Sequence, residues 1–232
     1  AAKMMKRSKM LERRRENAVQ EKEKLLKDIE SPEPLKINML HYHSSSLVTI
    51  KDLSVRYPDS DTPLFSGLSM EIRSGSRIAL SGKNGCGKSS LIRLILGENI
   101  PHTGEISAAS GLRISYVSQD TSQLHGTLSE FALHCGVDAS LLLTVLNKLG
   151  LERPQFEKRI ETYSEGQKKK VLLAKSLCEP AHLFVWDEPL NYIDIFSRIQ
   201  LEDLLLACQP SMLFVEHDRT FREKIATEII EL

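Results

Sequence analysis

Cysteine is scarce in this chain, and long apolar runs are absent. The 232 residues include four cysteines, Cys86, Cys135, Cys178 and Cys208, which lie far apart and form no C-x-x-C pair. This spacing argues against a zinc site or a disulfide framework, and free thiols are typical of a reducing compartment. The sequence shows neither a run of 18 apolar residues nor a signal peptide. We therefore expect a cytoplasmic protein whose own chain does not cross a membrane.

Neither sign of charge dominates the chain. The formal net charge is zero, with 31 basic and 31 acidic residues, but residues 1–15 are strongly basic and contain one acid, Glu12. The remainder is therefore slightly acidic. A chain of this length with 41% hydrophobic residues can bury one large core and still carry an appendage.

The basic segment predicts a long helix. Residues 2–30 contain no glycine or proline, and apolar residues recur every seven positions at Met4, Leu11, Ala18 and Leu25. A narrow apolar stripe of this kind fits one arm of a two-stranded coiled coil, and a solvated helical tail is the alternative. We expect a helical arm over residues 1–31, a solvent-exposed connector over 32–46 and one domain over 47–232.

A glycine-rich motif organises that domain. Gly82–Ser89 follows the pattern G-x-x-x-x-G-K-S, with an apolar strand-like run at Arg77–Ser81 before it and a helix-like run at Ser90–Leu96 after it. Strand, glycine-rich turn and helix are the context in which this pattern forms a phosphate-binding P-loop. A glycine-rich turn without a ligand is the alternative, and the flanking elements argue against it.

The chemistry of such a loop follows from its geometry. Glycines let the backbone curl so that its N–H groups face phosphate oxygens, and the helix N-terminus adds partial positive charge. Lys88 can reach the outer phosphates, and the Ser89 hydroxyl can ligate Mg²⁺. The candidate phosphate-binding residues are Gly82, Asn84, Gly85, Cys86, Gly87, Lys88, Ser89 and Ser90.

The rest of the domain alternates between strand and helix patterns. Short apolar runs at 182–186 and 212–215 are typical of buried parallel strands, and a helix is expected between them at about 195–207. Leu47–Ile50, Leu53–Tyr57 and Leu68–Ile72 alternate apolar and polar residues, as three separate strands with one solvated face do. Helices are expected over 127–149 and 165–178. This order predicts an α/β sheet that carries a helical insert at about 121–178.

Two acids follow one of the buried strands. Asp187 and Glu188 come directly after Leu183–Trp186. Ligands of an open α/β sheet lie beyond the carboxyl ends of its strands, so Asp187 is placed to organise Mg²⁺. Glu188 can then orient and polarise an attacking water. A charged turn without a ligand is the alternative for this pair taken alone.

Together these motifs resemble the nucleotide-binding domain of ABC ATPases. The resemblance covers roughly residues 47–232 and implies a parallel-sheet core with an antiparallel β subdomain, ATP as ligand and Mg²⁺ as its metal ion. By this resemblance Tyr57 stacks on adenine, Gln119 is the Q-loop ligand of Mg²⁺ and water, and His217 contacts the γ-phosphate. The predicted catalytic residues are Glu188, His217 and Lys88, and the predicted metal ligands are Ser89, Gln119 and Asp187.

The segment Tyr163–Gln167 resembles the signature of that family, usually written L-S-G-G-Q. By resemblance Ser164, Gly166 and Gln167 contact the nucleotide held by a second ABC domain. One departure matters here, because Glu165 replaces the first signature glycine. A carboxylate beside a γ-phosphate would be repulsive unless it points away, which puts the efficiency of that site in question.

The string from Asp187 to Asp194 narrows the resemblance to the ABC-F class, whose pattern is D-E-P-T-N-x-L-D. Leu190 and Ile193 depart from the pattern, while Asn191 and Asp194 match it. The chain then resembles the C-terminal half of an ABC-F protein of the antibiotic-resistance type. The implied partners are the missing first ABC domain, or a homodimer mate, and the ribosome with its RNA.

Two other functions remain open from the sequence. The chain could be the ATP-binding subunit of an ABC transporter that docks on a separate membrane protein, or a regulatory module with little turnover. In each case the resemblance implies that ATP hydrolysis by this half alone is weak, because each site needs a signature from a second domain.

Overall fold

Residues 35–58 and 62–232 are described by the structure, a computed structural model. The helical arm predicted over residues 1–31 lies outside the described residues and stays a prediction. The compact unit that the structure describes begins at Leu35.

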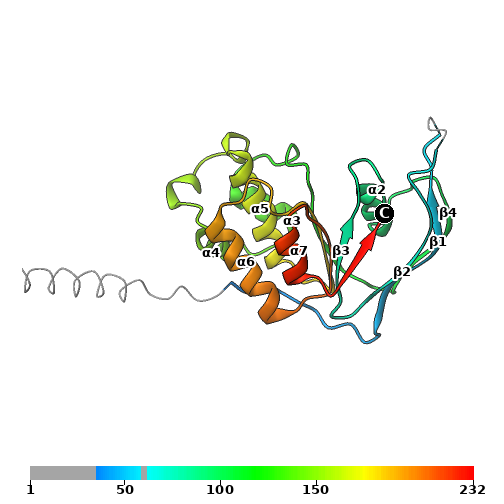
Figure 1. Cartoon of the computed structure of the whole chain (residues 1–232). Coiled ribbons are helices and arrows are strands. Elements are labelled where there is room, and N and C mark those ends of the chain that lie inside the picture. Colours follow the sequence, from blue (N-terminus) through cyan, green and yellow to red (C-terminus); the bar gives the residue numbers. More distant parts are fainter. Residues whose placement is uncertain (1–34, 59–61) are drawn as a thin grey trace, which may run out of the picture. The chain divides into compact units, whose positions relative to one another are not determined.

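A five-stranded parallel sheet forms the centre of this unit (Figure 1). Its strands run in the order β5-β6-β7-β3-β8. Their bounds are β3 Arg77–Ser81, β5 Ile114–Val117, β6 Leu183–Asp187, β7 Met212–Val215 and β8 Glu228–Glu231. The neighbouring ends of β3, β7 and β6 are in register, because Leu80 pairs with Val215 and Val215 pairs with Asp187.

Both faces of the sheet are buried, which explains its near-continuous apolar runs. Successive residues of β6 alternate between two cores: Leu183 and Val185 pack on one side, and Phe184 and Trp186 on the other. The first core also contains the apolar residues of α2 and of a second sheet, and the second core contains those of the remaining helices. A polar substitution at any of these strand positions would therefore disturb one of the cores.

The second sheet is antiparallel and has the strand order β2-β1-β4. Its bounds are β1 Ser46–Val55, β2 Phe65–Arg73 and β4 His102–Ala108. The sequence suggested two separate strands within β1, whereas the structure has one strand with irregular pairing on both sides. Asp52 adopts a left-handed backbone at this irregularity, with φ of 48°, and Gly104 of β4 lies against it. The α/β fold with a parallel core and an antiparallel sheet is confirmed.

The helices have the following bounds: α2 Lys88–Ile95, α3 Leu128–Cys135, α4 Ala139–Lys148, α5 Glu165–Cys178, α6 Ile195–Cys208 and α7 Arg219–Ile225. Two short 3₁₀ turns, Arg153–Gln155 and Ile160–Thr162, precede α5. The single helical stretch expected over 127–149 is divided into α3 and α4. Gly136 ends α3 in the left-handed conformation, which only glycine adopts without strain, and Asp138 caps α4.

Part of the segment predicted as an exposed connector packs on the domain. Leu35 is buried, and the backbone of Asn38 and Leu40 bonds to Leu177 and Ala181 at the end of α5. The apolar residues at 35, 37 and 39 alternate with polar ones, which is the pattern of a half-buried extended segment. That alternation is the signal in the sequence for this contact.

No single helix in residues 35–58 and 62–232 is long and apolar enough to span a membrane. The bent pair of α3 and α4 meets the requirement by length and composition only, with 119° between its helices. Residues of both helices belong to the helical core.

The contact between β1 and β4 gives a test of the fold. A Cβ atom at Gly104 would collide with the carbonyl oxygens of Lys51 and Asp52, whereas one at Gly67 of β2 would meet nothing within 4 Å. Both glycines have positive φ. We expect Gly67→Ala to lower the free energy of unfolding by about 1–2 kcal/mol, the cost of a left-handed conformation with a Cβ. Gly104→Ala should cost more, as measured by urea unfolding; equal losses would contradict the described packing.

Candidate functional site

The loop Gly82–Ser89 joins β3 to α2 and leaves backbone donors open. Gly85 and Gly87 have φ of 81° and 108°, a region that favours glycine. Among the described residues, no acceptor is bonded to the N–H groups of Asn84, Gly85 or Gly87. No side chain caps the N-terminus of α2 either. Open N–H groups at a helix N-terminus form a binding site for anions such as phosphate.

Lys88 lies beneath this loop. Its Nζ donates to the carbonyl oxygens of Gly82 and Lys83, each at 2.9 Å, and lies 3.9 Å from the sulfur of Cys86. The residue is 8% exposed, so the loop encloses a positive charge. An ammonium group has three donors: two bond to the carbonyl oxygens here, and the third makes a weak bond to the sulfur of Cys86. Thiol sulfur is a weak acceptor, so an anion in the loop can replace it.

A cleft of about 460 Å³ opens beside the loop. It is lined by Tyr57, Leu64, Asn84, Gly85, Gly87, Lys88, Ser89, Ser90, Gln119 and Glu188. The hydroxyl of Tyr57 lies 3.1 Å from Ser90 Oγ, which restrains the ring in the lining of the cleft. The lining thus combines an aromatic and an apolar side chain with a lysine and a carboxylate, which suits a nucleoside triphosphate.

Ser89 and Asp187 together provide oxygen ligands for a hard cation. Ser89 Oγ donates to Asp187 Oδ2 at 3.2 Å, and Asp187 is 3% exposed at the end of β6. Burial raises the pKa of Asp187, while the hydrogen bond from Ser89 lowers it. A hydroxyl beside a buried carboxylate fits Mg²⁺, which prefers oxygen ligands and neutralises the charge that burial disfavours. The residues present therefore fit the metal ion that the sequence predicted.

Glu188 is the most constrained acid of the site. Its φ of 49° is left-handed, and its N–H bonds to the carbonyl of Val215 at 3.0 Å. Its Oε2 accepts from Gln119 Nε2 at 2.8 Å and from Asn191 Nδ2 at 2.6 Å. Its Oε1 lies 3.0 Å from His217 Nε2. The strained backbone and three side chains aim one carboxylate at the cleft, as is common at functional sites.

A second buried acid connects the loops on either side of Glu188. Glu216 is 5% exposed, and burial raises its pKa. Its Oε1 accepts from the N–H of Leu190 at 2.7 Å, and its Oε2 accepts from the N–H of His217 at 3.1 Å. One carboxylate therefore holds the segment that carries Asn191 and the segment that carries His217.

The signature segment lies apart from the cleft. Ser164 and Gln167 form a reciprocal capping box at the start of α5, in which Ser164 Oγ accepts from the N–H of Gln167 and Gln167 Oε1 accepts from the N–H of Ser164. A Cβ on Gly166 would collide with the carbonyl oxygen of Tyr192, which explains the glycine at this position. Ser164, Gly166 and Gln167 are not among the residues that line the cleft.

The unusual Glu165 is tied back to its own domain. Its Oε2 accepts from the Thr121 hydroxyl at 2.5 Å, and its Oε1 accepts from Lys168 Nζ at 2.9 Å. The Thr121 hydroxyl, and next Lys168, lowers the pKa of Glu165. The Glu165 carboxylate is thus ionised and bonded to two donors. These bonds to Thr121 and Lys168 offset the repulsion between Glu165 and a γ-phosphate that was expected from the sequence.

The structure gathers most of the predicted residues at one edge of the parallel sheet. Gln119, which was predicted as a metal ligand, donates its amide N–H to Glu188 and makes no bond to the Ser89–Asp187 pair among the described residues. Three contributors were not among the predicted site residues: Leu64, Asn191 and Glu216. Asn191 had a signal, since it matches the D-E-P-T-N string, whereas no sequence pattern marks Leu64 or Glu216.

A glycine-rich loop between a strand and a helix, with Asp187 buried at the end of β6 beside Ser89, is characteristic of a P-loop nucleotide-binding domain. Comparison with known families gives the particular class. The family model described as "ABC transporter" matches residues 65–191, which is more than half of the chain. The chain belongs to this family, as an ABC ATPase domain of ABC-F-like type, and membership implies nucleotide binding.

Individual relatives agree. The chain is 30% identical over 216 residues to the ATP-binding protein Uup of Buchnera aphidicola, covering 90% of this chain and 36% of that protein. It is 30% identical to ABC transporter F family member 2 of Arabidopsis thaliana, covering 81% of this chain and 28% of the relative. The chain thus spans about a third of each relative's length. The structure of a bacterial Atm1-family ABC exporter with ATP bound has the same fold, with a TM-score of 0.71 at 19% identity over 84% of this chain and 38% of that one.

Cys86 provides a test of nucleotide binding in the loop. The residue is half-buried, and a triphosphate held by the loop would cover its sulfur. We expect Mg-ATP to slow the modification of Cys86 by N-ethylmaleimide several-fold, as followed by peptide mass mapping. Cys135 is also half-buried but lies in α3, so its modification rate should not change. Equal labelling of Cys86 with and without ATP would mean that nucleotide does not occupy the loop.

Proposed function

We propose that this chain binds Mg-ATP and hydrolyses it as one half of an ABC-F protein that acts on the ribosome under the control of ATP. The observation that carries the hydrolytic part is the setting of Glu188, which Gln119, Asn191 and His217 hold at the edge of the cleft. Membership of the ABC ATPase family supports ATP hydrolysis in general terms.

Each residue has a defined task in this proposal. The open N–H groups of the loop and the ammonium of Lys88 bind the phosphates. Ser89 and Asp187 hold Mg²⁺, which when bound supplies positive charge to the phosphate oxygens and orders their geometry. Tyr57 stacks on the adenine, with Leu64 beside it.

Glu188 orients the attacking water and accepts its proton. Gln119, Asn191 and His217 fix the carboxylate so that one lone pair faces the water. His217 is also accessible to the γ-phosphate, since its side chain is half exposed whereas that of Glu188 is largely buried.

A second ABC domain is part of the proposal. The signature residues Ser164 and Gly166 do not reach the cleft of their own domain, yet they start a helix whose N-terminus can bind an anion. In an ABC-F protein such a helix would complete the site of the other domain. A second copy of this chain could serve in its place, which would make turnover depend on concentration.

The ribosomal part rests on the family and on charge. ABC-F members are among the similar proteins. The basic residues of segment 1–15 suit contacts with RNA phosphates, and the heptad pattern fits an interdomain arm. Protection of ribosomes from an antibiotic is the form of the function that we favour, in a cytoplasmic setting.

Replacing the proposed base tests hydrolysis. We expect Glu188→Gln to lower the turnover of ATP at least about 100-fold, the usual range for loss of a general base. Binding of Mg-ATP should persist, because the bonds of Glu188 in the described residues go to Val215, Gln119, Asn191 and His217 and not to the loop Gly82–Ser89. Release of phosphate and equilibrium binding of ATP would be measured on the same preparation. A Glu188→Gln variant that hydrolyses ATP at the normal rate would remove Glu188 from this role.

Ribosome binding is tested by co-sedimentation of the full-length protein that contains this chain. With Glu188→Gln and ATP we expect a stable complex that weakens steeply as salt is raised, because basic residues release counterions from RNA. Failure to sediment with ribosomes, combined with co-purification of a transmembrane protein, would favour the transporter-subunit alternative.

A further inference from the structure

Lys169 is a buried lysine with no carboxylate at bonding distance. It is 1% exposed, in the second turn of α5, and makes no ion pair within the part of the chain that the structure describes. Burial of an ammonium group without such a partner is costly, so a lysine here needs a reason beyond packing.

The bonds of the ammonium group indicate that reason. Lys169 Nζ donates to the carbonyl oxygen of Ser118 at 2.9 Å and to that of Asp187 at 3.4 Å. Ser118 directly precedes Gln119, and Asp187 directly precedes Glu188. The lysine therefore holds the backbone one residue before each member of the hydrogen-bonded pair Gln119–Glu188.

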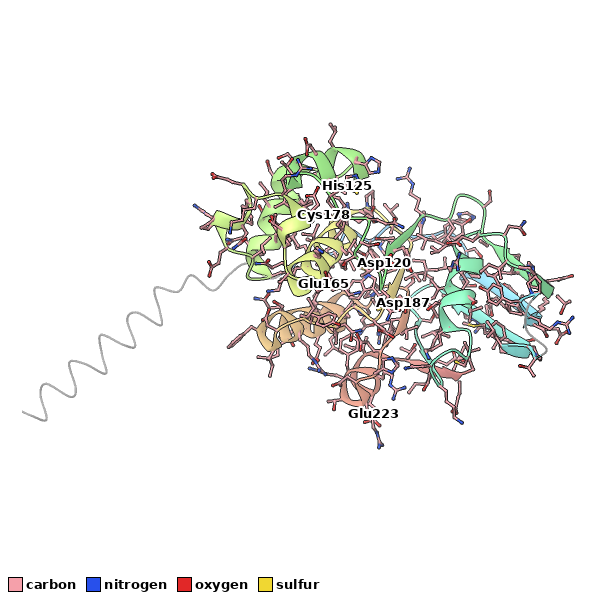
Figure 2. The ribbon with its side chains drawn as sticks, turned by 90° about the horizontal axis from the view of Figure 1, so that it is seen from above. Asp120, His125, Glu165, Cys178, Asp187 and Glu223 are labelled. Carbon is pink, nitrogen blue, oxygen red and sulfur yellow. The ribbon has the colours of Figure 1, made fainter. Side chains whose placement is uncertain are left out.

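Burial and the surrounding charges act on Lys169 in opposite directions. Burial holds the pKa of Lys169 below its usual range, and the charges of Asp187, Glu188, Glu216 and Glu165 offset this effect in part. The ammonium also lines a cavity of about 230 Å³. The other lining residues are Gln119, Asp120, Thr121, Glu165, Asn191 and Tyr192; Figure 2 labels Asp120, Glu165 and Asp187 in this region.

Other contacts tie the start of α5 to the same loops. Glu165 accepts from Thr121, Gly166 lies against the carbonyl of Tyr192, and Lys170 pairs with Asp194 at 2.6 Å. Each of these reaches one loop. Lys169 bonds to two, and both are loops that present a residue to the cleft.

We propose that Lys169 is a positioning residue that fixes the Gln119–Glu188 pair and couples it to the signature helix α5. The inference rests on the proposed ATP hydrolysis by Glu188. A displacement of the second domain against α5 would then be transmitted, through one ammonium group, to the carboxylate that orients water.

Lys169→Met tests this inference, with Lys175→Met as its control. Methionine fills a similar volume without a charge or donors, and Lys175 lies on the same helix in an ion pair with Glu179. We expect Lys169→Met to lower kcat about 10-fold or more, as small misplacements of catalytic groups do, with KM for ATP changed little. The melting temperature should change little, because the cost of burying the ammonium is removed together with its two bonds. Lys175→Met should keep the kcat of the wild type.

A double-mutant comparison separates positioning from general damage. If Lys169 acts through Gln119, the loss of kcat in Lys169→Met combined with Gln119→Ala should be smaller than the product of the two single losses. Multiplicative losses, or a fall in kcat that follows a fall in melting temperature, would overturn the proposal.

Hydrogen exchange gives a readout that does not depend on turnover. We expect faster exchange in peptides spanning residues 117–121 and 187–191 of Lys169→Met, and no change in Lys175→Met. Unchanged exchange would overturn the inference. A wild-type chain that neither binds nor hydrolyses ATP would instead contradict the proposed function, so the two failures are distinguishable.

Discussion

Parallel pairing of buried strands is the constraint on which the rest of this structure depends. Because Leu80, Val215 and Asp187 pair side by side, β3, β7 and β6 end at the same level. Val117 of β5 pairs with Trp186, so the loop that carries Gln119 begins beside them. Both faces of the sheet are covered, which leaves the carboxyl edge as the place where polar loops can meet. Four chemically different loops therefore converge although they are far apart in sequence.

At that edge the site is built around a network of charged side chains that are largely buried from solvent. Glu188 is held in a left-handed conformation by the backbone bond to Val215 and by three polar side chains. Such a conformation is costly for glutamate, and the neighbouring bonds offset the cost. Two buried side chains reinforce the arrangement. Glu216 accepts from backbone N–H groups, and Lys169 donates to backbone carbonyls. The carboxylate of Glu188 is thereby oriented by residues of the chain itself, which favours catalysis by preorganised groups.

The signature helix has a different relation to the site. Ser164 and Gln167 cap its first turn, Glu165 bonds to Thr121 and Lys168, and no residue of 164–167 lines the cleft. Its second turn reaches the loops of the site through Lys169. The helix is therefore anchored to the site without contributing a side chain to the cleft.

The sequence by itself determined the P-loop, the two carboxylates at the end of β6 and the α/β class. Each depends on a local pattern: glycines at fixed spacing, acids after an apolar run, or strands that alternate with helices. The division of residues 127–149 at Gly136, the joining of two expected strands into β1 and the docking of residues 35–40 were not foreseen, since turn geometry and contacts with distant residues decide them.

Only the tertiary structure decided the contacts of Asn191, Glu216 and Lys169, and the orientation of Glu165. Pairs such as Lys169 with Ser118, or Glu216 with Leu190, join residues many positions apart, and no periodicity encodes them. Whether a buried charge stabilises or disrupts depends on which donors and acceptors the fold brings within about 3 Å of it. That information exists only after the sheet has aligned its loops.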